Sequence, residues 1–231
     1  MAPVSSRLAT RVRGKLDREY VQARWRLLVR ATGARTSLEG AVVALSFDDG
    51  PVPGSTDRVL DVLHALDVRA TFFCVGRNAE RHPALLRRIA EEGHAVGSHS
   101  QTHPHPRDLS PRQVRHEYET GHRAVEQALG APVSLFRPPH GHLSAGTIPL
   151  LRRRRPWLWS RDPEDWRPGA AREPIERVGG AAGPGDVVLL HDWVEEPEAP
   201  EALDRSATIA ALPGIVAGVR ARGLDFGLLP S

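Results

Sequence analysis

The chain has 231 residues, of which 40% are hydrophobic and 26% charged, and its formal net charge is +3. This length is sufficient for one large domain with its own hydrophobic core. The basic excess is confined to the first 40 residues, which hold nine basic and three acidic side chains, so the remainder of the chain is slightly acidic. This distribution argues against a nucleic-acid-binding surface spread over the domain. Cys74 is the only cysteine, which excludes an internal disulfide and is compatible with a reducing compartment.

Residues 1–40 are predicted to form a basic, helical N-terminal extension, followed by a single domain over residues 41–231. The extension has no uninterrupted apolar stretch of the kind found in secretory signals, and no segment approaches the ~18 apolar residues of a membrane span. A cytoplasmic location is therefore expected. Residues 18–30 form a basic amphipathic pattern, which fits either a helix packed on the domain or a helix lying on an anionic membrane surface. The oligomeric state is not indicated.

From residue 41 onward, strand-like and helix-like segments alternate. Apolar and β-branched runs predict strands at 41–48, 70–76, 95–100, 133–139, 157–162, 186–192 and 224–229. Helical spacing of apolar residues, with capping residues at several ends, predicts helices at 55–67, 82–93, 110–130, 144–155 and 205–223, and a short helix followed by a loop at 174–185. Pro213 is expected to kink or interrupt the last helix, and the acidic, Pro-rich residues 195–204 are expected to form a solvated loop.

This alternation predicts an α/β fold with a parallel sheet and the helices outside it. A barrel of about seven strands and an open doubly wound sheet both fit the pattern. No glycine-rich phosphate loop follows the first strand, which argues against the dinucleotide-binding version of the open sheet.

Ionisable side chains fall at the carboxyl ends of the predicted strands. These residues are Asp48, Asp49, His99, His103, Arg137, Asp162, Asp165 and His191, and Trp166 follows Asp165. In a parallel β/α fold these ends lie on one side of the sheet, where active sites occur. Two adjacent carboxylates after a buried strand also cost free energy unless a metal, a cation or a catalytic role accounts for them.

The segment HSQTH (99–103) indicates a metal site. Two histidines at positions i and i+4 can share one face of a helical turn and so hold one metal, although His105 is a rival ligand. A carboxylate from the first strand would complete a set of two His and one Asp, which leaves open positions as a catalytic site requires. Of Asp48 and Asp49, one would then bind the metal and the other would accept a proton from metal-activated water.

The remaining polar residues have two interpretations each. His191 is either a hydrogen-bonded core histidine or the acid that protonates a leaving group. Arg137, between Phe136 and two prolines, is expected to be held rigidly and forked onto a carboxylate. Trp166 is either a core residue or a wall of a small apolar pocket.

Five motifs in order resemble those of the polysaccharide deacetylase family, the NodB-homology domain of carbohydrate esterase family 4. They are SFDDGP (46–51), HSQTH (99–103), RPPHG (137–141), DPEDW (162–166) and LLH (189–191). The family fold is a distorted (β/α) barrel of seven or eight strands, in agreement with the number of predicted strands. The resemblance implies hydrolysis of an N-acetyl group on an amino sugar, an oligosaccharide or a carrier-linked glycan, or sometimes of an O-acetyl ester.

The resemblance also implies roles for individual residues. Asp48 would be the catalytic base, steadied by Arg137, and His191 would be the acid, oriented by Asp165. The metal ligands would be Asp49, His99 and His103, and the ion would be divalent, most often Zn2+, with Co2+ or Ni2+ as alternatives. The substrate-binding residues would be Trp166, Leu189, Pro139 and His140, of which the first two would line the pocket for the acetyl methyl group.

One residue departs from the family pattern in a way that bears on the site. His140 stands where the family usually has Tyr, and that position typically supplies a backbone N–H to the oxyanion. The N–H is retained in His140, and a titratable ring is added. A catalytically silent sugar-binding module on the same fold and an iron oxygenase with two His and one carboxylate are the competing hypotheses.

Overall fold

A computed structural model describes residues 23–231. Its strands are β1 (Val42–Asp48), β2 (Thr71–Cys74), β3 (Ala95–Ser98), β4 (Leu135–Phe136), β5 (Val187–His191) and β6 (Asp225–Phe226). They form one parallel sheet in the order β4-β3-β2-β1-β5, with β6 paired to β1. β1 is therefore central, as expected for a run that is apolar on both faces.

The predicted strand at 157–162 appears as an irregular segment that closes the sheet. The Trp157 N–H donates to the Phe136 carbonyl at the end of β4, and the Leu189 N–H of β5 donates to the Arg161 carbonyl, both at 2.9 Å. The segment thus bridges the two edge strands, and the prediction of a distorted (β/α) barrel is confirmed.

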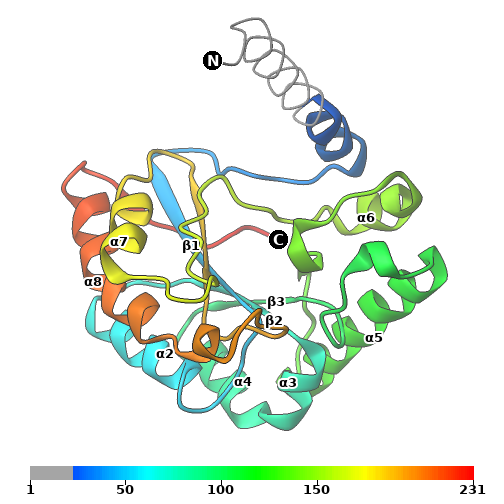
Figure 1. The fold of residues 1–231 in the computed structure, drawn as a ribbon, viewed down its shortest axis with the longest axis horizontal. Helices are drawn as coiled ribbons and strands as arrows, with labels where there is room; N and C mark the ends of the chain where they lie inside the picture. The colour runs from blue at the N-terminus through cyan, green and yellow to red at the C-terminus, as the bar shows by residue number, and fades with distance from the viewer. Residues whose placement is uncertain (1–22) are drawn as a thin grey trace, which may run out of the picture.

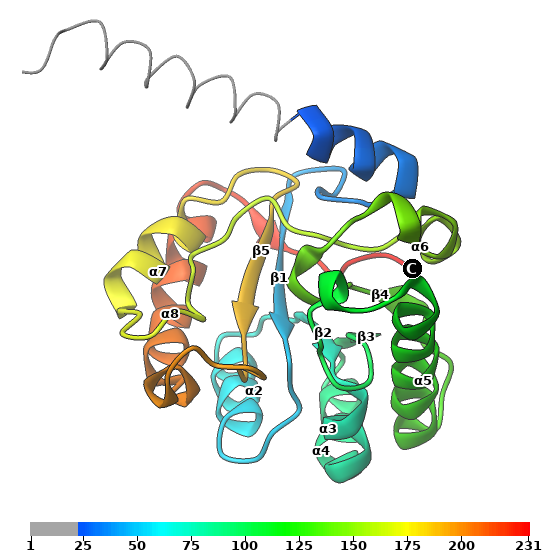
Figure 2. The same ribbon diagram turned by 45° about the vertical axis from the view of Figure 1, so that its right-hand side comes forward.

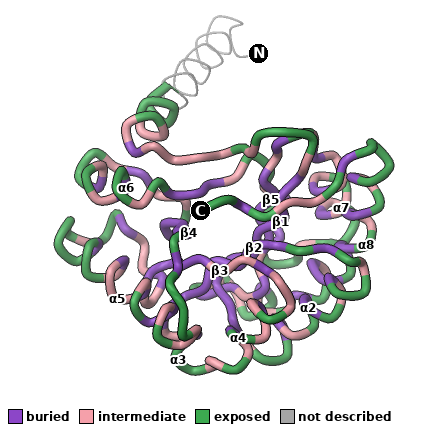
Figure 3. Tube along the Cα trace, turned by 180° about the vertical axis from the view of Figure 1, so that it is seen from behind, coloured by how far each residue is buried: buried purple, intermediate pink, exposed green. Residues whose placement is uncertain are grey.

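The helices lie outside the sheet (Figures 1 and 2). They are α2 (Thr56–Ala65), α3 (Gly76–Arg81), α4 (Pro83–Glu91), α5 (Pro111–Leu129), α6 (Ile148–Arg154), α7 (Arg172–Gly180) and α8 (Ser206–Arg220). α5 begins at a capping box of Ser110 and Gln113 and ends at Gly130 in the left-handed conformation. The buried trace follows the strands, and the exposed trace follows the outer helix faces (Figure 3).

Besides the strand at 157–162, two local predictions about the elements differ from the structure. The strand expected at 70–76 ends at Cys74, because the Gly76 N–H donates to the Ser100 carbonyl and the chain turns into the unpredicted helix α3. Only glycine fits at this turn, since a Cβ on Gly76 would lie 2.8 Å from the Cα of Gly121 in α5. In α8 Pro213 does not interrupt the helix, which continues to Arg220, and the alternative of a kink at Pro213 stays a prediction.

Residues 23–32 form a helix at the end of the sheet opposite the carboxyl ends of the strands (Figure 2). Leu28 and Val29 pack against a hydrophobic cluster that includes residues of α5 and α6, while Trp25 and Leu27 are exposed. The remainder of the predicted amphipathic segment, residues 18–22, lies outside the described part of the chain, and contact with a membrane remains a prediction.

The chain joins the sheet before residue 40. The Leu38 N–H donates to the Gly185 carbonyl at 2.8 Å, and Arg35 bridges to Trp157. The division of the chain at residue 40 stays a prediction. Within residues 23–231, no helix is both long and apolar enough to cross a bilayer.

Candidate active site

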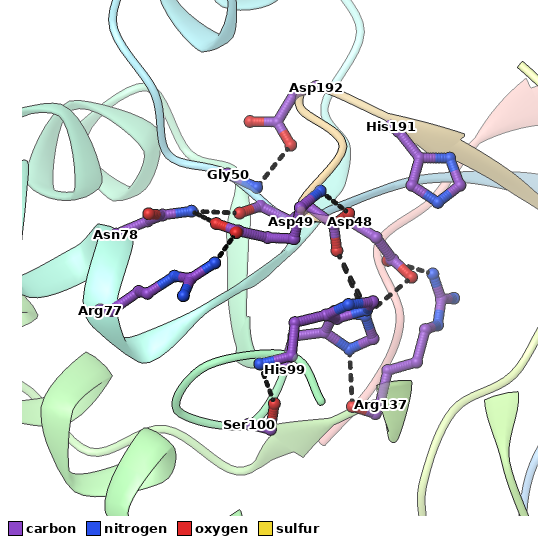
Figure 4. A network of polar contacts seen from close by, with 12 residues as sticks. Asp48, Asp49, Gly50, Arg77, Asn78, His99, Ser100, Arg137, His191 and Asp192 are labelled. Carbon is purple, nitrogen blue, oxygen red and sulfur yellow. Dashed lines mark hydrogen bonds and ion pairs between the residues drawn. The ribbon is translucent and has the colours of Figure 1, made fainter. Parts of the chain in front are cut away.

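The carboxyl ends of β1, β3, β4 and β5 bring the predicted site residues together (Figure 4). In the sheet register Asp48 of β1 lies beside His191 of β5. A cavity of about 510 Å3 opens above them. Its lining includes the predicted residues Asp48, Asp49, His99, His103, His140, Trp166, Leu189 and His191, and also His105, Arg107, Trp159, Asp162, Glu196 and Glu198. Arg137, Asp165 and Pro139 are buried and do not line it.

Arg137 fixes the Asp48 carboxylate. Its Nη1 donates to Asp48 Oδ1 at 2.6 Å, while Nε and Nη2 donate to the Trp157 and Leu158 carbonyls at 3.2 and 3.1 Å. The guanidinium also stacks 4.1 Å from the Phe73 ring centroid. The side chain is therefore rigid, as predicted, but the expected fork onto the carboxylate is wrong, because two of its nitrogens bind the segment that closes the sheet.

Three buried ligand atoms converge next to this pair. Asp49 Oδ1 lies 3.6 Å from His99 Nε2 and 3.4 Å from His103 Nε2. Ligands on a tetrahedral zinc ion at ~2.0–2.1 Å would be about 3.3 Å apart. Asp49 Oδ1 has no hydrogen-bond partner within residues 23–231. Both the spacing and this unsatisfied buried oxygen fit a divalent metal ion.

A loop, not a helical turn, presents the two histidines, so the helical interpretation of HSQTH was wrong. His103 has a positive φ of 60°, and its N–H donates to the Ser100 hydroxyl at 3.0 Å. His99 Nδ1 lies 2.8 Å from the Arg137 carbonyl, so Nδ1 carries the proton and Nε2 presents its lone pair to the centre. His105 Nδ1 instead accepts from the Arg107 N–H at 3.2 Å, and His105 is not part of the converging group.

Electrostatics also suit a metal site. Burial lowers the pKa of His99 to about 4, which keeps the ring neutral and able to ligate. Burial alone would raise the pKa of Asp49, but the nearby His103, His191 and His99 and the Glu195 N–H bring it below its ordinary value. The Asp49 carboxylate is thus ionised next to the neutral imidazole of His99.

Sequence reasoning missed a clamp on Asp49, which we define as Arg77, Asn78 and Glu195. The Glu195 N–H donates to Asp49 Oδ2 at 2.9 Å, and the Asn78 amide donates to the Asp49 carbonyl at 2.8 Å. The Glu195 carboxylate, 7% exposed, accepts from Asn78 and pairs with Arg77. The side chains of Asn78 and Arg77 lie beside Asp49 (Figure 4). The prediction that residues 195–204 form a solvated loop was therefore wrong at its first residue.

Asn78→Ala is expected to weaken metal binding by ~10–100-fold, the usual effect of losing a partner that orients a ligand. The substitution removes the bond to the Asp49 carbonyl and leaves Glu195 without one of its two partners. Competition with a fluorescent zinc chelator measures the change. Glu201→Ala, at an exposed position in the same loop, serves as the control; equal affinities for wild type and Asn78→Ala would contradict the role of the clamp.

His191 is held from behind by Asp165. His191 Nδ1 lies 2.8 Å from Asp165 Oδ1, and the His191 N–H donates to Oδ2 at 2.9 Å. The Thr208 hydroxyl donates to the same Oδ2, and Arg205 Nη1 donates to the Asp165 carbonyl at 2.7 Å. Burial opposes protonation of the ring, but Asp165, together with the more distant Asp49 and Asp48, raises the pKa of His191 to about 9.

Asp192, the next residue, was also missed, and it secures the turn after Asp49. Its buried carboxylate accepts from the Gly50 N–H at 3.1 Å and from the Thr56 hydroxyl at 2.5 Å. Burial raises the pKa of Asp192 to about 7. A Cβ on Gly50 would lie 1.9 Å from Asp192, which explains the glycine of SFDDGP. In the sequence, adjacency to His191 is the only signal for this role.

His140 lies at the rim of the cavity. Its ring stacks on His105 at 4.4 Å between centroids and contacts the metal-ligand candidate His103 at 4.7 Å. Burial and the neighbouring histidines lower the pKa of His140 to about 3, so the ring is a neutral surface. Its backbone has a positive φ of 56°, at a turn that follows β4.

Comparison with known proteins places the chain in a family. Residues 35–154 match the polysaccharide deacetylase family model. A chitooligosaccharide deacetylase from Bradyrhizobium sp. is 38% identical over 197 residues, which cover 81% of this chain and 89% of that protein. A peptidoglycan-N-acetylglucosamine deacetylase from Bacillus cereus is 33% identical over 194 residues, covering 80% and 84%. The structure of a family 4 carbohydrate esterase from Streptomyces lividans in complex with acetate has a TM-score of 0.73 at 33% identity, covering 83% and 94%.

The chain is therefore a carbohydrate deacetylase, a hydrolase of amide bonds other than peptide bonds. More narrowly, it belongs to the polysaccharide deacetylase family, as its five motifs predicted.

Proposed function

We propose that this enzyme removes the N-acetyl group of an amino sugar within an oligosaccharide or carrier-linked glycan, with a divalent metal ion as cofactor. The observation that supports this most directly is one cavity in which a fixed carboxylate, three convergent metal-ligand atoms and a carboxylate-backed histidine lie together. Atoms balance as one water added to the amide, with acetate and a free amine released.

Asp49, His99 and His103 would hold the ion, with zinc favoured by two imidazoles and one carboxylate. When bound there, the ion lowers the pKa of water and polarises the acetyl carbonyl. Asp48 directly precedes the ligand Asp49 in the chain, and its Oδ1 is already bound to Arg137. Its other oxygen, Oδ2, faces the centre at 3.5 Å from His99 Nε2, where it can accept the proton of the attacking water.

His191 would supply a proton to the leaving amine. Its Nδ1 is engaged by Asp165, so Nε2 is the nitrogen free to donate. A pKa of about 9 keeps the ring protonated at neutral pH, as an acid requires. The His140 N–H would donate to the developing oxyanion. Trp166 and Leu189, both at the cavity wall, would contact the acetyl methyl group.

The substrate proposal draws support from the relatives. Two of them are named for N-acetylated glycans, chitooligosaccharide and the N-acetylglucosamine of peptidoglycan. The Streptomyces lividans esterase was solved with acetate, which is the product that acetyl hydrolysis yields. An amino sugar with a free acetamide is accordingly the first substrate class to test.

An acetate-release screen tests the proposal. The enzyme is loaded with Zn2+, Co2+ or Ni2+ and given monomeric, oligomeric and carrier-linked N-acetyl sugars beside O-acetylated xylan. Acetate from the N-acetyl sugars is expected. Release from the O-acetyl substrate alone would make the enzyme an O-acetyl esterase, and tight sugar binding without any acetate would favour a silent sugar-binding module.

A further inference from the structure

A second cavity, of about 410 Å3, lies on the flank of the domain between α5, α6 and the residues that lead into β4. None of the residues that line it also lines the catalytic cavity. Its volume is in the range of ~300–1,000 Å3 that small-molecule sites occupy. It is a separate site candidate, independent of the proposed deacetylase mechanism.

The charged residues of this cavity are unbalanced. α5 contributes Arg115 and Glu119, and α6 contributes Arg153 and Arg154. Three guanidiniums and one carboxylate leave a net charge of +2, because burial and the charge of Arg154 lower the pKa of the fifth titratable residue, His122, and keep it neutral. None of the four charged groups forms an ion pair with another residue of the described chain, 23–231.

Arg154 makes this imbalance costly. It is half-buried, and its guanidinium lies 5.2 Å from the Phe136 ring centroid. Burial lowers its pKa, while Glu119 acts in the opposite sense from beyond ion-pair distance. A partly desolvated charge without an ion-pair partner is unfavourable, and an anion bound beside Arg154 would offset that cost.

The rest of the lining shows what the anion would be attached to. Val133, Pro149 and Leu150 form an apolar wall, and the exposed Ser134 adds a hydroxyl beside it. We propose that this cavity binds a phosphomonoester of a sugar-sized molecule. The phosphate dianion matches the net charge of +2 and the planar donors of the arginines, and the organic part would lie on the apolar wall.

The ligand would bind behind the metal-ligand wall, outside the catalytic mouth. His122 Nδ1 lies 3.3 Å from Ser98 Oγ, and Ser98 directly precedes the metal-ligand candidate His99. The side chains of two successive strand residues point to opposite faces. An occupant in contact with His122 would therefore lie on the far side of β3 from the metal-ligand candidates and leave the catalytic cavity free.

Isothermal titration calorimetry in phosphate-free, low-salt buffer tests the proposal with four probes: glucose 6-phosphate, inorganic phosphate, glucuronate and glucose. Glucose 6-phosphate is expected to bind at least about tenfold more tightly than the monoanion glucuronate, and glucose is expected to give no heat. Inorganic phosphate should bind more weakly than the ester. Equal binding of phosphate and the ester would overturn the assignment of a sugar to the apolar wall.

Variants of opposite charge change make the test site-specific. Arg153→Gln/Arg154→Gln is expected to weaken glucose 6-phosphate binding at least about tenfold, and Glu119→Gln is expected to strengthen it. The matched control, Arg112→Gln/Arg123→Gln, removes two exposed arginines of α5 outside the cavity and should change affinity less than about twofold. An equal loss in the control, or absent binding to the wild type, would overturn the proposal.

A stability measurement separates a binding role from a structural one. Arg154→Met keeps an unbranched, flexible side chain at this position while removing the guanidinium, which is the group that faces the Phe136 ring. The melting temperature without ligand is expected to be unchanged or higher, and the rise in melting temperature caused by glucose 6-phosphate should disappear. A lower melting temperature with the ligand response intact would assign Arg154 to structure alone.

Discussion

Asp48→Asn is expected to lower deacetylation by ~10²–10⁴-fold while the enzyme still binds about one metal ion per chain. The substitution keeps the shape of the side chain and its acceptor towards Arg137, but the amide cannot take a proton from water. Asp49, His99 and His103 are unchanged, so the metal ligands remain in place. Acetate release and metal content by atomic absorption, measured on the same sample, give the result.

Asp49→Asn is the matched comparison, one residue along the same turn. It weakens the carboxylate ligand that converges with the two histidines, and metal content should fall together with activity. Loss of metal from Asp48→Asn with retention in Asp49→Asn would reverse the roles assigned to the two aspartates.

The sequence predicted those parts of the site whose residues stand at the ends of parallel strands. Asp48, His99, Arg137 and His191 each stand at or directly after the last residue of a parallel strand, and parallel topology alone brings such positions to one edge. Buried apolar runs and helix caps located most of the elements in the same way. Among the elements, the order of the strands, the closing segment and helix α3 required the structure.

What could not be predicted depends on loop backbones. The positive φ values of Asp49 and His103 direct the two ligands to one point, and no periodicity in the sequence reports them. The contact between Glu195 and Asn78 joins residues 117 positions apart, so the local sequence does not report it. The acidic, Pro-rich composition around Glu195 therefore predicted an exposed side chain where the structure has a buried one. Composition describes the average exposure of a segment, whereas a buried carboxylate is determined by its particular partners.

Asp165→Asn is expected to move the basic limb of the pH profile of kcat/KM down by about two pH units or more. Asp165 contributes most to raising the pKa of His191 to about 9, and burial, which favours the neutral ring, remains in the variant. The pKa should therefore fall to ~6.5 or below. At pH 8 the protonated fraction of the ring would drop from about nine-tenths to ~3%, a loss of ~30-fold that shrinks towards pH 6.

The raised pKa of His191 also makes the free energy of unfolding depend on pH, and the direction of this dependence can be measured in the metal-free protein. A histidine with a raised pKa stabilises the fold fully below its unfolded pKa of ~6.5, and this contribution is lost as pH rises through about 9. Urea unfolding from pH 6 to 9 should show this decline in wild type and lose it in Asp165→Asn. Asp162→Asn is the control, because it removes a carboxylate of the same motif that accepts from the Glu164 N–H rather than from His191.

In the kinetic experiment, a basic limb of the kcat/KM profile that stays in place in Asp165→Asn would show that His191 is not the proton donor to the amine.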